Sequence, residues 1–410
     1  MSEKPLLFRS IRLFHPGEGV DKTTDVVVED GKIVAIEEGI DRSGYDVIDA
    51  TGWTALPGFY DMHVHLREPG GTHKETIRSG CASAANGGFT GVACMPNTMP
   101  AIDEATVVDA ILARAATLPV RVDVVGAITV GRKGQQLAPI GELYDSGVRL
   151  FSDDGDCLRS PETMRRAFEY ASQFDGAVLS QHCEEHVMTE GFVMNEGAVS
   201  TRLGVAGYPT IAEELIIERD IRLSTFTGDR PYHVSHMSTK GGVDSVRRAK
   251  EAGRTNVSCE VAPHHFCLTD EAVDTYGSLA KMNPPLRDEE HRQALIRGIA
   301  DGTVDVIATD HAPHTADEKN VELDQAPNGI VGLETSIGLA YTELVVPGHI
   351  DLARFVELMA LNPRQILSIP QPSFAVGSDA EMTIVATEER WSVRSAEFLS
   401  QCTNMPFESW

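Results

Sequence analysis

Eight short apolar runs, separated by longer helix-like segments, dominate the sequence from about residue 57 onward. The runs read GFYDMHVHL, TGVACMPN, RVDVVGAIT, GVRLFSDDG, GAVLSQHC, PYHVSHMS, NVSCEVAPHH and VDVIATDHAPH. Helical spacing of apolar residues occurs between them, in 103–117, 161–174, 212–223, 240–252 and 289–301. Strands that alternate with helices form parallel sheets, and eight such units are typical of a closed (β/α)8 barrel. We therefore predict an α/β fold with a TIM-type barrel over residues 57–368. An open doubly wound sheet is the alternative, but no G-x-G-x-x-G motif follows the first strand.

A second, smaller unit is predicted from the two ends of the chain. Residues 1–56 contain the runs SIRLFHP, DVVVED, KIVAIEEGI and YDVIDA, which are rich in β-branched residues and separated by turn residues. After a helical stretch at 351–368, the run FAVGSDAEMTIVATEE has strand character again. We expect residues 1–56 and 369–410 to form one small β domain beside the barrel.

Charge and cysteine content restrict the partners and the compartment. The 410 residues include 35 Lys and Arg against 61 Asp and Glu, a net charge of -26 that repels nucleic acid. An anionic substrate would therefore need a local positive site. The seven cysteines form no C-x-x-C pair, which fits a reducing cytoplasm. The N-terminus lacks the apolar stretch of a secretion signal, and no run of about 18 apolar residues predicts a membrane span.

Polar residues follow the predicted strands at the points where the strands end. They are His63, His65, Asn97, Asp153, His182, His236, His264 and Asp310. Barrel enzymes build their active sites at the C-terminal ends of their strands, because the loops there surround one opening. We therefore expect these side chains to meet at one end of the barrel.

The residue types in this set favour a metal site. His63 and His65 lie two apart on a strand and so share a face, which suits a divalent cation. With His182, His236 and Asp310 they could hold two cations if a carboxylate bridged them, and either Asp153 or Asp154 could serve. A ligand set of nitrogen and oxygen atoms favours zinc, with manganese or cobalt as alternatives.

Eight motifs in this order resemble the dihydroorotase family, in the bacterial type I branch of the amidohydrolase superfamily. They are HVHLREPG, MPNT, SDDG, QHCEE, SHMST, KMNPPLR, ATDHAPHT and GIVGLET. The resemblance covers about residues 5–407. It implies that His63, His65 and Asp310 bind one metal, that His182 and His236 bind a second, and that Asp153 bridges them. The run GVRLFSDDG contains no lysine, so the carboxylated lysine that bridges the metals in many amidohydrolases is not expected.

The resemblance also implies an activity and a substrate site. The reaction is the reversible cyclisation of N-carbamoyl-L-aspartate to L-dihydroorotate in de novo pyrimidine biosynthesis, by a metal-activated hydroxide with Asp310 as acid and base. Arg67 and His314 are expected to bind the substrate carboxylate. Further substrate contacts are expected from His65, Asn97, Asn283, Asn328 and Gly329. The family has a Pro-Phe-Gly stretch where this chain has Pro327-Asn328-Gly329, so Asn328 replaces a phenylalanine.

Two alternatives remain open from the sequence. One is another cyclic amidase, of allantoinase or dihydropyrimidinase type, whose substrate has no ring carboxylate for Arg67 to bind. The other is a barrel without activity that serves as a partner of aspartate transcarbamoylase. A homo-oligomer is expected for the dihydroorotase, and a complex with aspartate transcarbamoylase is also compatible with catalysis. The polar segment 315–327 is a candidate for an active-site lid.

Overall fold

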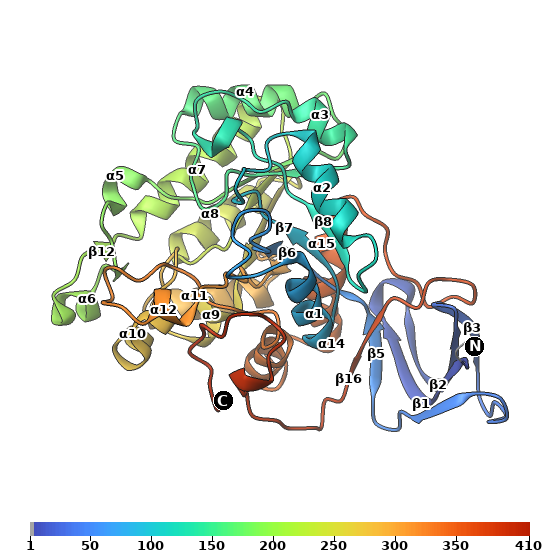
Figure 1. Ribbon diagram of the computed structural model, residues 1–410. Coiled ribbons are helices and arrows are strands. Elements are labelled where there is room, and N and C mark those ends of the chain that lie inside the picture. The colour runs from blue at the N-terminus through green and yellow to red at the C-terminus, as the bar shows by residue number, and fades with distance from the viewer. Residues whose placement is uncertain (1–3) are drawn as a thin grey trace.

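The computed structural model describes residues 4–410, which form an α/β body with a small β sheet beside it (Figure 1). The small sheet has the strand order β16-β5-β1-β2-β3, and β4 pairs with β1. Its strands are β1 (Leu6–His15), β2 (Val20–Glu29), β3 (Lys32–Glu37), β4 (Asp46–Asp49), β5 (Thr54–Pro57) and β16 (Met382–Val385). Both ends of the chain thus contribute to this sheet, as predicted.

All eight predicted strands of the body are present, and all their pairings are parallel. One sheet has the order β6-β7-β8 and the other β15-β14-β13-β10-β9. The strands are β6 (Phe59–Val64), β7 (Phe89–Cys94), β8 (Arg121–Val124), β9 (Leu150–Phe151), β10 (Val178–Gln181), β13 (Tyr232–Val234), β14 (Val257–Val261) and β15 (Val306–Ile307). Single parallel bridges join Gly126 to Phe151 and Val64 to His311, at the two places where the sheets meet. The predicted α/β class with parallel strands is therefore confirmed.

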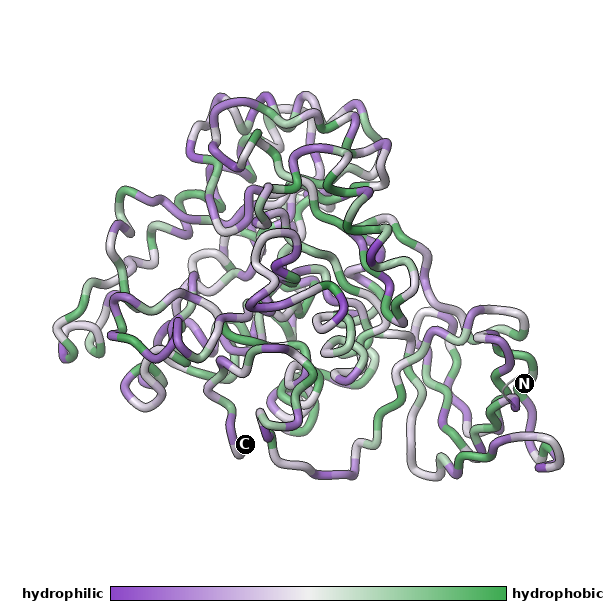
Figure 2. The backbone as a smooth tube through the Cα atoms, in the orientation of Figure 1, coloured by the Kyte–Doolittle hydropathy of each residue, from purple (hydrophilic) through white to green (hydrophobic). Residues whose placement is uncertain are grey.

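Helices connect successive strands, and all five predicted helical stretches are helical. The main helices are α1 (Ile77–Asn86), α2 (Ala105–Ala115), α3 (Ile140–Asp145), α4 (Pro161–Ala171), α7 (Ile211–Phe226), α8 (Lys240–Glu251), α11 (Glu289–Ala300), α14 (Leu352–Val356) and α15 (Asn362–Ile366). Several start where a side-chain oxygen accepts a hydrogen bond from a free backbone N–H, as Ser160, Thr239 and Asp288 do. Hydrophilic and hydrophobic segments alternate along the outer helices (Figure 2), because each helix packs one face on the strands.

Short elements extend the loops beyond the C-terminal ends of the strands. Those after β10 are α5 (His186–Thr189), β11 (Met194–Asn195), α6 (Ala198–Leu203) and β12 (Gly207–Tyr208). Those after β14 and β15 are α9 (Pro263–Cys267), α10 (Glu271–Tyr276), α12 (Ala316–Lys319) and α13 (Ser336–Ala340). These additions follow the same strand ends that carry the polar residues.

The C-terminal segment corrects one predicted domain boundary. Of residues 369–410, β16 pairs with β5 and Asp379 forms an antiparallel bridge with Lys32 of β3, and Figure 1 shows the chain crossing back to the α/β body after β16. Met405 and Phe407 are buried in an apolar cluster with Met282 and Ile330 of the body. The assignment of this last stretch to the small domain was wrong, because its apolar side chains find their core on the body.

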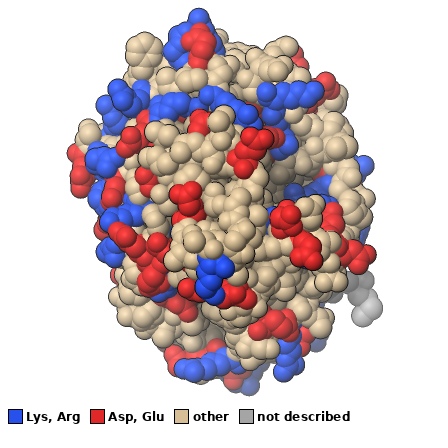
Figure 3. Space-filling model, turned by 90° about the vertical axis from the view of Figure 1, so that its left-hand side faces the viewer, with Lys and Arg blue, Asp and Glu red and all other residues tan. Residues whose placement is uncertain are grey.

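Charged side chains of both signs are interspersed on the face shown in Figure 3. On this face the acidic residues are thus mixed with basic ones, and a binding site for an anion has to be sought in particular residues. Throughout residues 4–410, the longest apolar helices fall short of what a membrane crossing requires.

Candidate active site

Histidine and aspartate side chains from five strands meet at the C-terminal ends of those strands. His63 lies in β6 and His65 just after it, while Asp154, His182, His236 and Asp310 follow β9, β10, β13 and β15 within three residues. All six are buried. Two groups of possible metal ligands share His63, namely His63 with Asp154 and His236, and His63 with His65 and Asp310.

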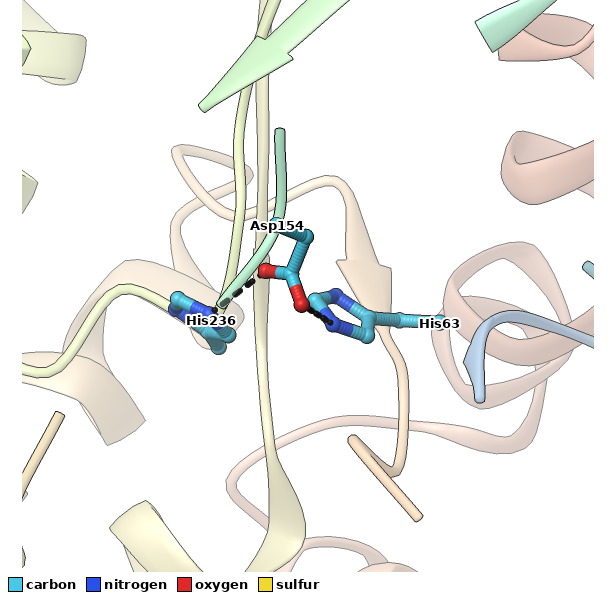
Figure 4. Close-up of side chains that lie close together, drawn as sticks. All are labelled: His63, Asp154 and His236. Atoms are coloured by element: carbon cyan, nitrogen blue, oxygen red, sulfur yellow. Dashed lines mark ion pairs between the residues drawn. The ribbon is translucent and has the colours of Figure 1, made fainter. Parts of the chain in front are cut away.

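Asp154 lies at the centre of the site, with its carboxylate between the rings of His63 and His236 (Figure 4). Its Oδ2 is 3.5 Å from Nε2 of His63 and 3.6 Å from Nε2 of His65. Its Oδ1 is 3.3 Å from Nε2 of His236 and 3.8 Å from Nδ1 of His182. Each carboxylate oxygen therefore faces two imidazole nitrogens, one pair on each side.

Asp153, which the resemblance implies as the bridging carboxylate, points away from these histidines. Its Oδ1 accepts hydrogen bonds from the backbone N–H groups of Ile128 and Thr129, at 2.9 and 3.0 Å, and its Oδ2 accepts one from the Thr129 hydroxyl. Burial raises the pKa of this carboxyl to about 6. The placement expected for Asp153 was wrong: it supports the loop after β8, and its neighbour Asp154 occupies the central position.

The buried polar atoms of the centre fit a divalent cation. Within residues 4–410, neither Nε2 of His63 nor Oδ1 of Asp154 has a hydrogen-bond partner. Nδ1 of His182 and Nε2 of His236 face each other at 2.9 Å. Unpaired buried nitrogen and carboxylate lone pairs are costly unless a proton or a cation lies between them. The donor set of imidazole nitrogens and carboxylate oxygens is one that zinc binds well.

Asp310 adjoins the centre from the last strand. Its Oδ1 lies 2.9 Å from Nε2 of His65 and 3.6 Å from Nε2 of His63. Burial acts to raise the pKa of Asp310, but the hydrogen bond from His65 and the charges of nearby histidines outweigh it and hold the pKa at about 2. The carboxyl is therefore ionised at neutral pH.

Hydrogen bonds on the outer nitrogens fix the orientation of three rings. Nδ1 of His63 lies 2.5 Å from Oε1 of Glu260, and Nε2 of His182 lies 3.0 Å from Oε2 of Glu184. Nδ1 of His65 lies 2.8 Å from Oδ1 of Asn97, and the amide nitrogen of Asn97 stays available for the substrate contact predicted for it. Such partners hold an imidazole with its other nitrogen directed at the metal position.

Glu260 was not among the residues predicted from the sequence. It lies in β14, where its Oε1 also accepts from the backbone N–H of His236 and its Oε2 is 3.2 Å from Nε2 of His233. A glutamate inside the apolar run NVSCEV was the signal that could have identified it, because a charge in a buried strand needs a partner.

Replacing Glu260 by glutamine should weaken metal binding about 10- to 100-fold, because the partner that fixes the His63 ring would lose its charge. Metal titration of the metal-free variant, compared with the wild type, measures the effect. Glu251→Gln, an exposed change at the end of α8, serves as the control. An unchanged affinity in the Glu260 variant would contradict the assigned role.

The residues predicted to bind the carboxylate lie together beside this centre. Arg67 donates from Nε to the carbonyl of Pro313 at 3.3 Å, and its Nη2 is 3.4 Å from Nε2 of His314. The ammonium of Lys74 lies 3.2 Å from Nδ1 of the same ring. Burial, followed by the charges of Arg67, Lys74 and Lys319, lowers the pKa of His314 to about 3. Lys74 also pairs with Glu318 at 2.8 Å, so the guanidinium of Arg67, beside a neutral imidazole, is the positive group that an anion can meet here.

Asn283, Asn328 and Gly329 come from the loops after β14 and β15. Asn283 donates from Nδ2 to Glu184 at 2.9 Å, while its Oδ1 and that of Asn328 are buried and, in the described chain, without partners. Gly329 has a φ of +143°, and a Cβ there would lie 2.8 Å from the carbonyl oxygen of Ala312 and 2.9 Å from Cδ2 of His314. Only glycine allows this close approach.

Comparison with known proteins places these residues in a family context. A family model described as dihydro-orotase-like matches residues 52–242. The dihydroorotase of Acetivibrio thermocellus is 46% identical over 403 residues, covering 98% of this chain and 94% of its own. The dihydroorotase of Pelotomaculum thermopropionicum is 47% identical over 402 residues, covering 98% and 93%.

Two solved structures with a similar fold carry the names hydantoinase and dihydropyrimidinase. The L-hydantoinase (dihydropyrimidinase) of Arthrobacter aurescens has a TM-score of 0.86 at 24% identity, covering 100% of this chain and 92% of its own. The dihydropyrimidinase of Brevibacillus agri has a TM-score of 0.84 at 20% identity, covering 99% and 91%. At these identities the likeness concerns the fold.

Proposed function

Because this chain belongs to the dihydroorotase family, we propose that it catalyses the reversible cyclisation of N-carbamoyl-L-aspartate to L-dihydroorotate and water in pyrimidine biosynthesis. The observation that carries the proposal is the position of Asp154 between four histidines, with Asp310 on one side and Arg67 with His314 nearby. The histidines with Asp154 and Asp310 suit the metal-assisted hydrolysis of an amide. Arg67 with His314 suits a substrate that carries a carboxylate. A homo-oligomer and a complex with aspartate transcarbamoylase stay predictions from the resemblance.

We infer that the eight parallel strands close into one (β/α)8 barrel over residues 57–368. The two single bridges at the seams between the sheets support this. So does an apolar cluster that combines side chains of both sheets, among them Tyr60 and Met62 from β6, Leu150 from β9 and Val306 from β15. A barrel brings the C-terminal ends of its first and last strands side by side, as the site requires for His65 and Asp310.

We propose that the centre binds zinc and has room for two ions per subunit. His63, His65 and Asp310 would hold the first, His182 and His236 the second, and Asp154 would bind both. A cation there would lower the pKa of a bound water to about 7 and polarise the amide carbonyl.

The chain's own residues supply proton transfer. Asp310 is ionised at neutral pH and can accept a proton at the reacting centre during hydrolysis. The protonated carboxyl then donates to the leaving nitrogen as the ring opens. In cyclisation the same carboxyl acts in the opposite order, because the forward and reverse reactions pass through the same transition state.

Arg67 and His314 are proposed to bind the carboxylate of the substrate. When Nδ1 of His314 accepts a hydrogen bond from Lys74, the ring proton lies on Nε2, beside the guanidinium of Arg67. Two donors that face the same space suit a carboxylate. Buried oxygens of Asn283 and Asn328 are available to accept from ring N–H groups.

The loss of L-dihydroorotate absorbance in the ultraviolet tests the proposed function. Purified protein with added zinc should consume the substrate, and removal of the metal by a chelator should abolish the loss until zinc is restored. No turnover with zinc bound would contradict the activity. A chain that neither turns over nor binds zinc would match a non-catalytic partner of aspartate transcarbamoylase.

Replacing Arg67 by methionine should raise KM for L-dihydroorotate about 100-fold, because charge-assisted hydrogen bonds to the carboxylate would be lost. Steady-state kinetics measure the change, and the exposed Arg78→Met on α1 is the matched control. If KM stayed unchanged, a cyclic amide without a carboxylate, such as a hydantoin or a dihydropyrimidine, would become the better substrate assignment.

A further inference from the structure

A buried lysine without an acidic partner lies next to the loop that carries Asn328 and Gly329. Lys319 ends α12 and is 2% exposed. Its ammonium nitrogen is 2.9 Å from the carbonyl oxygen of Pro327 and 3.4 Å from that of Lys281. Among residues 4–410, no carboxylate forms an ion pair with it. A buried lysine is costly without such a partner, so its presence calls for a structural reason.

The two carbonyl contacts can persist whether or not the amine carries a charge. Burial, with a smaller contribution from the positive charge of Lys281, lowers the pKa of Lys319 to about 7. A neutral amine still has two N–H groups, and Lys319 has two carbonyl oxygens to satisfy. The hydrogen bonds therefore need no buried charge at physiological pH.

These contacts belong to a group of bonds that joins two segments of the chain, 278–283 and 319–329. The carbonyl of Lys281 also accepts from the backbone N–H of Gly329 at 3.0 Å. In the other direction, the ammonium of Lys281 donates to the carbonyl of Leu323 at 2.7 Å. The hydroxyl of Ser278 donates to the carbonyl of Lys319 itself. The candidate lid segment is thus tied down near both of its ends.

Both joined segments carry groups that the proposed function places on the substrate ring. Asn283 lies two residues after Lys281, and Asn328 directly follows the Pro327 carbonyl that Lys319 binds. The metal centre is positioned by strand ends and by Glu260 and Glu184, and Asn283 reaches it through its hydrogen bond to Glu184, whereas Lys319 binds backbone carbonyls of the two segments. A change at Lys319 should therefore affect ring binding more than it affects the chemical step.

We propose that Lys319 is a positioning residue that fixes the Asn328–Gly329 turn against the Asn283 segment and so sets the spacing of the groups that bind the substrate ring. This inference rests on the proposed function for the ring contacts. The link between the segments itself does not depend on that function. A specificity role follows, because a rigid pair of ring contacts favours one ring size and shape.

Lys319→Met tests this proposal, because methionine fills a similar apolar volume and removes both donors. KM for L-dihydroorotate should rise about 10-fold while kcat and bound zinc stay within about threefold of the wild type, as expected when binding groups lose preorganisation. Lys22→Met on the exposed part of β2 is the control. A fall in kcat with loss of zinc would show that Lys319 supports the whole site and would overturn the proposal, as would an unchanged KM.

A readout without substrate separates this inference from the proposed activity. Amide hydrogen exchange in residues 320–329 should be faster in Lys319→Met than in the wild type, with residues 59–66 unchanged. Equal protection in both proteins would overturn the positioning role even if dihydroorotase activity were established. If the wild type had no such activity, faster exchange would still support the link. Should Lys319→Met not fold, Ser278→Ala weakens the same link. It should give a smaller rise in KM and faster exchange. If Ser278→Ala altered neither KM nor exchange, the proposal would be overturned.

Discussion

Asp154→Asn should lower the turnover of L-dihydroorotate more than about 100-fold. This is a larger loss than expected for a residue such as Glu260, which only hydrogen-bonds a proposed metal ligand. The aspartate supplies a negative charge between the two histidine pairs, each oxygen facing two imidazole nitrogens. An asparagine would present one weak oxygen donor and one N–H group that repels a cation. Turnover and zinc content should therefore fall together, measured by absorbance and by metal analysis of the purified variant.

The neighbouring Asp153→Asn provides a matched control. Asparagine keeps an oxygen for the backbone N–H groups of Ile128 and Thr129, so the loop should keep its shape. We expect turnover within a few fold of the wild type and a loss of about 1 kcal/mol in the free energy of unfolding, from the weakened Thr129 contact. Loss of zinc in Asp153→Asn, with activity retained in Asp154→Asn, would return the bridging role to Asp153.

Asp310→Asn should lower kcat by a factor of about 100 to 10,000 in both directions of the reaction, the range expected for loss of a general acid and base. The amide keeps an oxygen beside His65 but can neither accept nor donate the proton. KM should change much less than kcat, because the carboxylate of the substrate is bound by other residues.

Kinetics of hydrolysis and cyclisation, with zinc measured on the same samples, check this expectation for Asp310. A variant that retains zinc and more than a tenth of the wild-type kcat would exclude Asp310 as the proton carrier. A loss of kcat in one direction of the reaction but not in the other would also contradict this role of Asp310, because both directions share one transition state.

Much of the fold could be predicted because the strands are short, apolar and bounded by polar residues. The period of two residues along a strand placed His63 and His65 on one face, and both lie within 3.6 Å of Asp310 in the structure. The same rule cannot distinguish Asp153 from Asp154. β9 ends at Phe151, so both aspartates lie in the turn beyond it, where the direction of each side chain depends on which backbone groups are nearby. The backbone N–H groups of Ile128 and Thr129 hold Asp153, which leaves Asp154 for the histidines.

The sequence by itself determined the eight strand–helix units, the types of residue at the strand ends and the family, because these depend on local periodicity and on motifs read along the chain. Only the tertiary structure decided which aspartate is central, that Glu260 orients His63, and that the C-terminal segment packs on the body. It alone brings Lys319 to the carbonyls of Pro327 and Lys281. These features depend on contacts between residues far apart in the sequence, where a polar group is satisfied by whichever partner the packed chain brings within hydrogen-bond distance.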